Sequence, residues 1–228
     1  QSILTLYINW SINFMKDSNK HKGLRKKLVL ELLNKGIRDE KVLNVINLIP
    51  RHFFLDKDFE NFAYIDKPFP IGEDQTISQP YTVAFQTEKL KINTGDKILE
   101  IGSGSGYQTS ILVSLKADVY SIERIYNLYK SSKKILSSIN LMPKKIVWGD
   151  GYLGLLDVAP FDKILIAAAC NEIPTKLLKQ LKIGGKMILP IGNKKNQIMN
   201  LITRISENKI KKIELGNFLF VPMLKNKI

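Results

Sequence analysis

Acidic residues stand at or beside the ends of three short apolar segments. Glu100 lies near the end of KILEI (97–101), Glu123 directly follows DVYSI, and Asp150 comes two residues after KIVW. The carboxyl ends of parallel strands meet at one edge of a sheet, which is where ligands bind in open α/β folds. A carboxylate at that edge can accept hydrogen bonds from a ribose diol or from an amino group. The spacing therefore predicts a nucleoside-binding edge with Glu123 on the ribose and Asp150 on the base.

A glycine-rich turn, IGSGSGYQ, follows the first of these segments. Gly102, Gly104 and Gly106 allow a sharp turn and a close approach of the backbone to a ligand. The spacing departs from the G-x-G-x-x-G pattern of dinucleotide-binding proteins, because residue 107 is a tyrosine. Tight strand-to-helix turns also use glycine for packing alone, so the acidic residues beside the turn carry most of the argument.

The segments around these residues alternate between strand and helix patterns. Apolar runs typical of buried strands occupy 97–101, 118–122, 145–148, 162–168 and 186–191. Helical patterns separate most of them and occupy 80–91, 106–116, 124–139 and 174–182. This order predicts a doubly wound α/β fold with a mostly parallel sheet. The C-terminal part lacks helical periodicity, and we expect antiparallel strands at QIMNLITRI and in the LFVPML region.

A small helical preface is predicted before the sheet. Four leucines recur on one face of a helix over 23–36, and Asp39 can cap a second helix that ends before Pro50. The polar loop before the sheet, QTISQP, leads into a third helix with Pro80 at its first position. Ser78 or Gln79 could serve there simply as a helix cap.

The chain divides into one domain and an N-terminal arm. Residues 1–22 are expected to form an arm or a processed segment, 23–78 the preface and a substrate loop, and 79–228 the α/β core. The apolar run 3–15 is too short to span a bilayer. A cytoplasmic location is expected, although the absence of an initial methionine leaves an export signal upstream, and hence the periplasm, open.

Composition limits the partners. The formal net charge is +14, but only five of the 35 basic residues are arginine and the lysines are spread along the chain. Lysine lacks the fork geometry that suits phosphate or guanine, so we expect a weakly steering surface without a dedicated nucleic-acid site. The single Cys170 excludes an intrachain disulfide and is expected to be a buried, inert thiol. His21 and His52 are the only histidines, so no metal site is predicted.

The glycine-rich turn, together with the strand-ending acid Glu100 just before it, resembles motif I of the S-adenosylmethionine-dependent methyltransferases. That resemblance implies that Glu100 lies near the cationic methionine part of the cofactor. Longer motifs resemble one family, the protein-L-isoaspartate O-methyltransferases. They are GDGYLGLLDVAPFDKI (149–164), PIGEDQTISQPY (70–81), GIRDEKVLNVINLIPRHFF (36–54), AAACNEIPTKLLKQLKIGGKMILPIG (167–192) and FVPML (220–224).

The resemblance covers roughly 24–224 and implies an activity. In this family a methyl group passes from S-adenosylmethionine to the free α-carboxylate of L-isoaspartyl residues in damaged proteins and peptides. The resulting ester collapses to a succinimide, and hydrolysis of that ring returns some normal aspartate. Ser78 matches the family's active-site serine. The residues expected to surround the cofactor are Thr76, Ile77, Glu100, Gly102, Ser103, Gly104, Gly106, Glu123, Arg124, Asp150 and Gly151.

The alternatives to this interpretation are a nucleic-acid or small-molecule methyltransferase on the same fold, and a non-catalytic module that binds the cofactor. Methyltransferases of nucleic-acid amino groups typically carry an Asn/Asp-Pro-Pro-aromatic segment after the fourth strand, where this chain reads AAACNEIP. The acidic pair and Ser78 favour an enzyme, and we expect it to act as a monomer.

Overall fold

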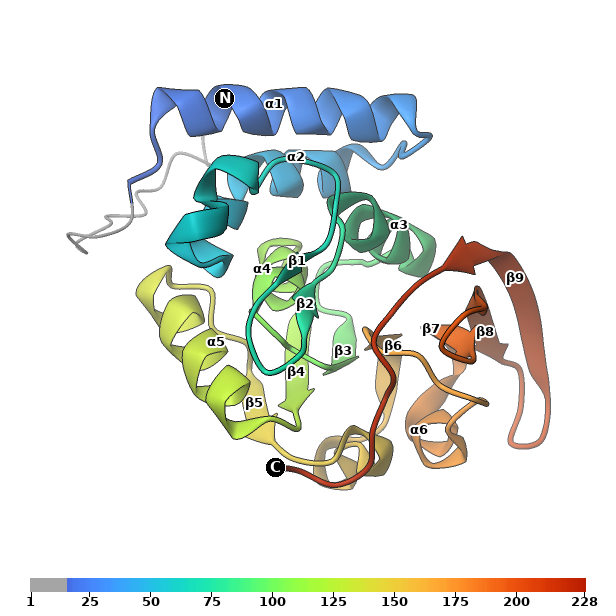
Figure 1. Cartoon of the computed structure of the whole chain (residues 1–228). Coiled ribbons are helices and arrows are strands. Elements are labelled where there is room, and N and C mark those ends of the chain that lie inside the picture. Colours follow the sequence, from blue (N-terminus) through green and yellow to red (C-terminus); the bar gives the residue numbers. More distant parts are fainter. Residues whose placement is uncertain (1–15) are drawn as a thin grey trace.

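The computed structural model describes residues 16–228, so the apolar run 3–15 of the expected N-terminal arm lies outside the described residues. Within this range, a central sheet carries helices on both faces (Figure 1). Its seven strands run in the order β5-β4-β3-β6-β7-β8-β9. The strands are β3 Lys97–Ile101, β4 Asp118–Glu123, β5 Lys145–Trp148, β6 Phe161–Ile166, β7 Leu181–Gly192, β8 Gln197–Arg204 and β9 Ile210–Phe218.

The pairing confirms the predicted fold class. Strands β5, β4, β3, β6 and β7 are parallel to one another, whereas β7, β8 and β9 pair antiparallel. The chain adds β4 and β5 on one side of β3 and then returns to add β6 on the other side. This reversal beside β3 creates a crevice at the carboxyl ends of β3 and β6, which is the usual ligand position in such sheets.

The helices also follow the predicted order. They are α1 Asn19–Asn34, α2 Glu40–Leu48, α3 Pro80–Leu90, α4 Tyr107–Ser114, α5 Tyr126–Ser138 and α6 Thr175–Gln180. Short 3-10 turns are η1 Arg51–Phe54, η2 Lys57–Phe62, η3 Gly151–Leu153 and η4 Leu156–Val158. Helix α1 begins earlier than predicted, because the Ser18 hydroxyl accepts a hydrogen bond from the backbone N–H of His21 at 3.2 Å and caps the helix.

Alternate residues of each central strand enter different cores. In β3, Ile98 packs in the cluster that holds Leu90 of α3 and Leu112 of α4, whereas Leu99 packs in the cluster that holds Leu177 of α6. Both strand residues are completely buried. A strand that buries both faces reads as a continuous apolar run, which is why the sequence pattern located these strands well.

The C-terminal prediction was only partly right. Strand β8 lies at QIMNLITRI as expected, but the last strand is β9 at 210–218 and not the LFVPML region at 219–224. Residues of β9 are mostly exposed and several are charged, as on many edge strands, so the apolar pattern did not reveal it. The LFVPML region contains Pro222, which has no N–H to donate to a ladder and forms only an isolated bridge with Ala169.

A two-stranded sheet lies over the carboxyl edge of the main sheet (Figure 1). It consists of β1 Phe69–Pro70 and β2 Thr76–Ile77 and leads directly into α3. No helix within residues 16–228 is both long and apolar enough to cross a membrane.

Candidate active site

The turn between β3 and α4 brings the backbone to the crevice. Gly104 and Gly106 both have positive φ, at 51° and 90°, which side chains rarely allow. A Cβ atom on Gly106 would also lie 3.2 Å from the Leu136 side chain of α5, so glycine here serves close packing as well. The turn is therefore held against α5 while its other side faces the crevice.

Glu123 ends β4 beside this turn. Its Oε2 accepts a hydrogen bond from the Gly104 N–H and its Oε1 accepts one from the Ile125 N–H, both at 2.9 Å. The residue is only 4% exposed. Each carboxylate oxygen has a further lone pair, so Glu123 can still accept hydrogen bonds from a diol.

A narrow pocket collects most of the expected cofactor residues. Thr76, Gly102, Gly104, Glu123, Arg124 and Gly151 all line it. Residues 221–224, which follow β9, form the opposite wall. The space is about 70 Å³, whereas pockets that bury drug-sized ligands typically measure about 300–1,000 Å³. The pocket is therefore smaller than a nucleoside cofactor, and residues 221–224 are the part of its lining that follows β9.

Other expected cofactor residues lie around this pocket without lining it. Ile77 is a buried residue of β2, and Gly106 precedes the first residue of α4. Asp150 faces a separate surface pocket, where its carboxylate accepts hydrogen bonds from the backbone N–H groups of Tyr152 at 2.8 Å and Asn226 at 2.9 Å. Its neighbour Gly151 does line the cofactor pocket, so Asp150 is adjacent to it.

Two buried side-chain oxygen atoms near the turn lack hydrogen-bond partners within residues 16–228. Glu100 Oε2 accepts hydrogen bonds from the hydroxyls of Thr109 and Ser121 at 2.6 and 2.7 Å, but its Oε1 has no partner. Burial raises the pKa of Glu100 to about 7. The Ser103 hydroxyl is also buried and without a partner. Orphaned polar atoms beside a glycine turn fit a polar ligand such as S-adenosylmethionine, which Glu123, Ser103 and the turn would hold.

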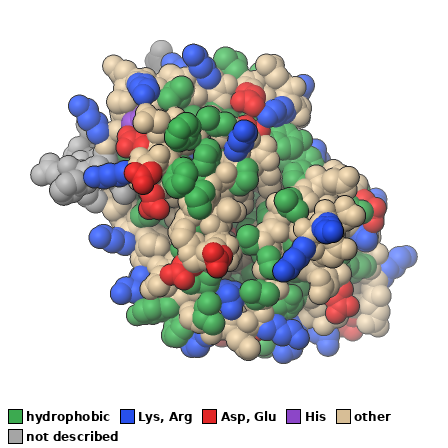
Figure 2. Space-filling model, viewed as in Figure 1, with side chains coloured by type: hydrophobic (Ala, Val, Ile, Leu, Met, Phe, Trp, Pro, Cys, Tyr) green, Lys and Arg blue, Asp and Glu red, His purple; other side chains and the backbone are tan. Residues whose placement is uncertain are grey.

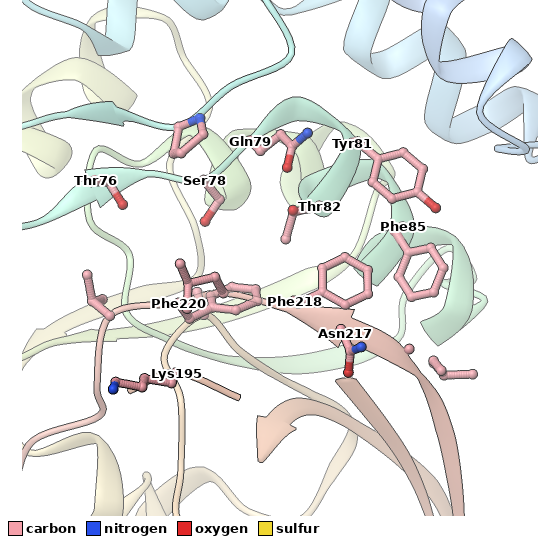
Figure 3. A pocket seen from close by; sticks show the side chains of 16 residues that line it. Thr76, Ser78, Gln79, Tyr81, Thr82, Phe85, Lys195, Asn217, Phe218 and Phe220 are labelled. Carbon is pink, nitrogen blue, oxygen red and sulfur yellow. The ribbon is translucent and has the colours of Figure 1, made fainter. Parts of the chain in front are cut away.

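A wider cleft adjoins the narrow pocket. Its volume is about 680 Å³, and it shares Thr76, Ala167 and Val221 with the narrow pocket. In Figure 3 the side chains of Thr76 in β2, Ser78 in the following loop and Thr82 in α3 point into this cleft. Phe218 and Phe220 form the opposite side. Among residues 16–228, those that line the cleft include one cation, Lys195, and no Asp, Glu or His. The cleft can therefore accept an anionic group next to hydroxyl donors.

The Ser78 loop is held in place by two residues that the sequence analysis did not single out. The guanidinium of Arg51 is completely buried, donates a hydrogen bond to the Ser78 carbonyl at 2.9 Å and lies 4.8 Å from the centroid of the Tyr107 ring. Asp66 accepts a hydrogen bond from the Tyr81 N–H at 2.7 Å and one from the Gln79 side chain at 3.1 Å. Asp66 thus caps α3 from a distant loop.

The alternative prediction, that Ser78 or Gln79 serves as the side-chain cap of α3, is wrong. Neither Ser78 nor Gln79 makes a side-chain cap hydrogen bond to α3. The Ser78 hydroxyl is thereby left free to face the cleft. The sequence of residues 51–70 is irregular and did not predict the roles of Arg51 and Asp66. The contacts of these two residues with the Ser78 loop depend on the folded path of the chain.

The remaining chemistry-bearing groups lie away from this site or are inert. Cys170 is completely buried, and burial raises its pKa to about 12, which keeps the thiol protonated, as predicted. Figure 2 shows basic side chains scattered among other residues on the viewed face. The expectation of no dedicated nucleic-acid site remains a prediction.

Comparisons with known proteins agree with this geometry. Residues 23–228 match the family model of protein-L-isoaspartate(D-aspartate) O-methyltransferase. Protein-L-isoaspartate O-methyltransferases of Christiangramia forsetii and Flavobacterium psychrophilum are 53% and 52% identical to the chain, over 93% of this chain and all of theirs.

A solved structure resembles the chain along nearly its whole length. The protein-L-isoaspartate O-methyltransferase of Plasmodium falciparum, in complex with S-adenosyl-L-homocysteine, has a TM-score of 0.78 and 27% identity. The match covers 89% of this chain and 99% of that one. The chain therefore belongs to the protein-L-isoaspartate(D-aspartate) O-methyltransferase family.

Proposed function

We propose that this chain methylates the free α-carboxylate of L-isoaspartyl residues in proteins and peptides, and that Ser78 orients that carboxylate. The observation that carries the proposal is the junction of the two pockets. Thr76 lines both the narrow pocket and the wide cleft, and Ser78, two residues later, faces the cleft. A methyl donor on one side and an acceptor on the other would meet beside this segment.

The narrow pocket is the cofactor side of the proposal. S-adenosylmethionine supplies an activated methyl group on a sulfonium centre. Glu123 would accept hydrogen bonds from the ribose hydroxyls, and Asp150 would accept one from the adenine amino group. The other expected contacts, Thr76, Ile77, Glu100, Gly102, Ser103, Gly104, Gly106, Arg124 and Gly151, remain proposals of the same kind.

The wide cleft is the substrate side. A carboxylate has an unperturbed pKa of about 4, so it is ionised at neutral pH and needs no base to activate it. This requirement agrees with a cleft lined by hydroxyls and Lys195, without His, Asp or Glu. The task of the protein is alignment: Arg51 fixes the backbone of Ser78, and the Ser78 hydroxyl donates a hydrogen bond to the carboxylate.

Single-turnover methylation of matched isoaspartyl and aspartyl peptides tests the proposal. The isoaspartyl peptide should react and the aspartyl peptide should not, and the rate should show no ascending limb between about pH 6 and 8 of the kind an imidazole base gives. Ser78→Ala should lower the rate by about 10- to 100-fold, because one orienting donor is lost. Equal rates on the two peptides contradict the substrate assignment.

A control variant separates this effect from general damage. Ser206→Ala removes an exposed hydroxyl from the turn between β8 and β9 and should leave the rate unchanged. Both variants should bind S-adenosyl-L-homocysteine like the wild type. If Ser78→Ala also keeps the wild-type rate, the serine has no role in positioning the substrate.

The finer expectations on assembly and location stand as further proposals. We propose a cytoplasmic monomer without a nucleic-acid substrate, on the strength of the dispersed lysines and the self-contained pockets. Sedimentation of the purified chain would test whether it is a monomer. A labelled-methyl assay on RNA would test whether it methylates nucleic acid.

A further inference from the structure

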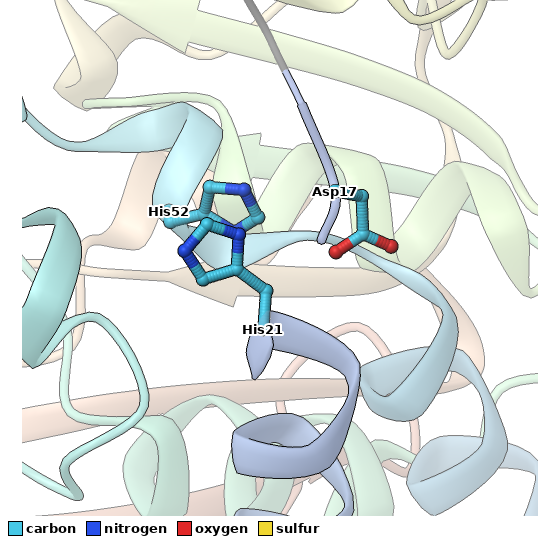
Figure 4. Close-up of side chains that lie close together, drawn as sticks. All are labelled: Asp17, His21 and His52. Atoms are coloured by element: carbon cyan, nitrogen blue, oxygen red, sulfur yellow. The ribbon is translucent and has the colours of Figure 1, made fainter. Parts of the chain in front are cut away.

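Three chemistry-bearing side chains gather at the start of α1, away from both pockets. Asp17 precedes the helix, His21 lies in its first turn, and His52 belongs to η1 (Figure 4). The two imidazole rings lie with their centroids 3.9 Å apart and their planes tilted by 36°. One ligand atom from each of the three residues lies within 4.8 Å of the other two. The methyl-transfer proposal uses none of them.

The contacts of His21 place a lone pair in this cluster. Its Nε2 lies 3.2 Å from the Glu60 carboxylate, which can only accept, so Nε2 carries a proton. The Ser18 N–H points at Nδ1 from 3.4 Å. The Lys16 carbonyl oxygen lies 3.3 Å from the same Nδ1. The single lone pair of Nδ1 thus accepts the Ser18 N–H in a long hydrogen bond. A cation between Nδ1 and the Lys16 carbonyl oxygen would take the place of that N–H.

His52 presents a second nitrogen. The residue is only 6% exposed, and its Nδ1 lies 2.7 Å from the Tyr64 hydroxyl. Its Nε2 is buried and has no hydrogen-bond partner within residues 16–228. Buried polar atoms are nearly always partnered, so this nitrogen calls for a ligand.

The remaining ring nitrogens already have the partners that metal-binding histidines use. In metal sites the second nitrogen of each histidine usually donates to a carboxylate or another acceptor, which fixes the ring. Glu60 occupies this position for His21. For His52 the position is taken by the Tyr64 hydroxyl oxygen, which accepts from Arg25 at 3.0 Å and has a second lone pair for an Nδ1–H of His52. Both rings are thus oriented by outer groups.

The charges of the cluster also favour a cation. Asp17 and Glu60 contribute two negative charges, and Arg25 contributes one positive charge through paired hydrogen bonds of 3.0 and 2.9 Å to the Asp17 carboxylate. The balance is −1 before any ion is added. Each Asp17 oxygen keeps a second lone pair, because Arg25 uses only one on each.

We propose that Asp17 Oδ, His21 Nδ1 and His52 Nε2, together with the Lys16 carbonyl, bind a divalent transition-metal ion of the Zn²⁺ type. Two imidazoles and two oxygens form a ligand set that suits Zn²⁺. The ion fastens residues 16–17 onto η1 and stabilises the start of α1, so the site is structural. This departs from the sequence-based expectation of no metal site, which could not foresee that residues 31 positions apart would share one place.

Calorimetric titration of the full chain with Zn²⁺ tests the site, after chelator treatment and at about pH 7.5. His21 and His52 are the only histidines and Cys170 is buried, so the chain offers little competition for the ion. One Zn²⁺ should bind per chain and raise the midpoint of thermal unfolding. Asp17→Asn and His52→Gln should each weaken binding by about 100-fold, and Tyr64→Phe by about 10- to 100-fold.

A control variant and a second readout keep the result specific. Glu31→Gln removes an exposed carboxylate of α1 that pairs with Lys35, and it should bind Zn²⁺ like the wild type. Co²⁺ in place of Zn²⁺ should give intense visible absorption that Asp17→Asn weakens, and Asp17 lies outside the buried core, so this variant should fold. Affinity for S-adenosyl-L-homocysteine should stay the same in all variants. The absence of one-to-one Zn²⁺ binding, or equal binding by wild type and Asp17→Asn, would overturn the proposal.

Discussion

The carboxylate of Asp150 accepts a hydrogen bond from the backbone N–H of Asn226 at 2.9 Å, and this contact ties the end of the chain to the end of β5. Ile228 continues the connection: its N–H donates to the Arg124 carbonyl and its carbonyl accepts from the Tyr126 N–H, both at 2.8 Å. Residues 221–228, which we name the C-terminal strap, therefore occupy the edge where a nucleoside would approach Glu123 and Asp150.

Deleting residues 225–228 should accelerate cofactor association. If the strap and the cofactor compete for the same edge, the free protein would bind only in the fraction of molecules with an open strap. Loss of a single hydrogen bond of about 1 kcal/mol corresponds to a roughly fivefold change in that fraction. Stopped-flow fluorescence of Trp148, whose indole N–H donates to the Ile228 carbonyl at 3.0 Å, would follow binding of S-adenosyl-L-homocysteine in a Trp10→Phe background.

Lys227→Ala is the control for this measurement. It removes the ammonium that lies 4.1 Å from the Trp148 ring centroid but keeps the backbone contacts of the strap. Its fluorescence should change while its association rate stays close to that of the wild type. An unchanged rate in the deletion variant would show that the strap does not gate the pocket.

Glu123→Gln should weaken binding of S-adenosyl-L-homocysteine by roughly 10- to 100-fold, because a hydrogen bond to a charged group contributes about 1.5–3 kcal/mol. The amide also turns a donor toward one of the two backbone N–H groups that Glu123 now accepts from. Asp118→Asn, at the exposed opposite end of β4, should bind normally. Equal affinities of the two variants by calorimetry would remove Glu123 from the ribose site.

The sequence predicted the central elements well and the long-range contacts poorly. The predicted bounds of β3 and β5 are those of the structure. Strand β3 is a continuous apolar run because it is buried on both faces. Strand β5 lies at the edge of the sheet and is only partly buried, but its short apolar run KIVW still marked it. The edge strand β9 was missed because its residues are mostly exposed. The contact of Asp66 with the start of α3 and that of Asp150 with Asn226 join distant segments, so no local pattern records them.

Arg51→Met should separate activity from stability. The buried guanidinium makes its hydrogen bond to the Ser78 carbonyl at the cost of desolvating a charge, and burial lowers the pKa of Arg51 to about 10. Apolar replacement of buried charged groups is often neutral or stabilising. We expect the variant to unfold at or above the wild-type denaturant concentration, yet to turn over isoaspartyl peptide about 10-fold more slowly, because the Ser78 loop is no longer fixed.

Arg51→Lys serves as the comparison, since it keeps a charge at this position but cannot reproduce the fork of the guanidinium. It should recover part of the turnover, with affinity for S-adenosyl-L-homocysteine unchanged in both variants. Wild-type turnover in Arg51→Met would show that the contact with Ser78 serves packing only.

Glu100→Gln should change how stability depends on pH. Burial raises the pKa of Glu100 to about 7 in the folded protein, against 4.5 for the ordinary group, so the folded state binds more protons between these values. Its contribution to stability is therefore fully present below about pH 4.5 and is lost as the pH rises through 7. Glutamine mimics the neutral carboxyl, because its oxygen can still accept from Thr109 and Ser121. Urea unfolding of the wild type and the variant should give similar free energies at pH 5, whereas at pH 8 the variant should be more stable by about 2–3 kcal/mol. A constant difference between pH 5 and 8 would mean that Glu100 does not titrate in this range.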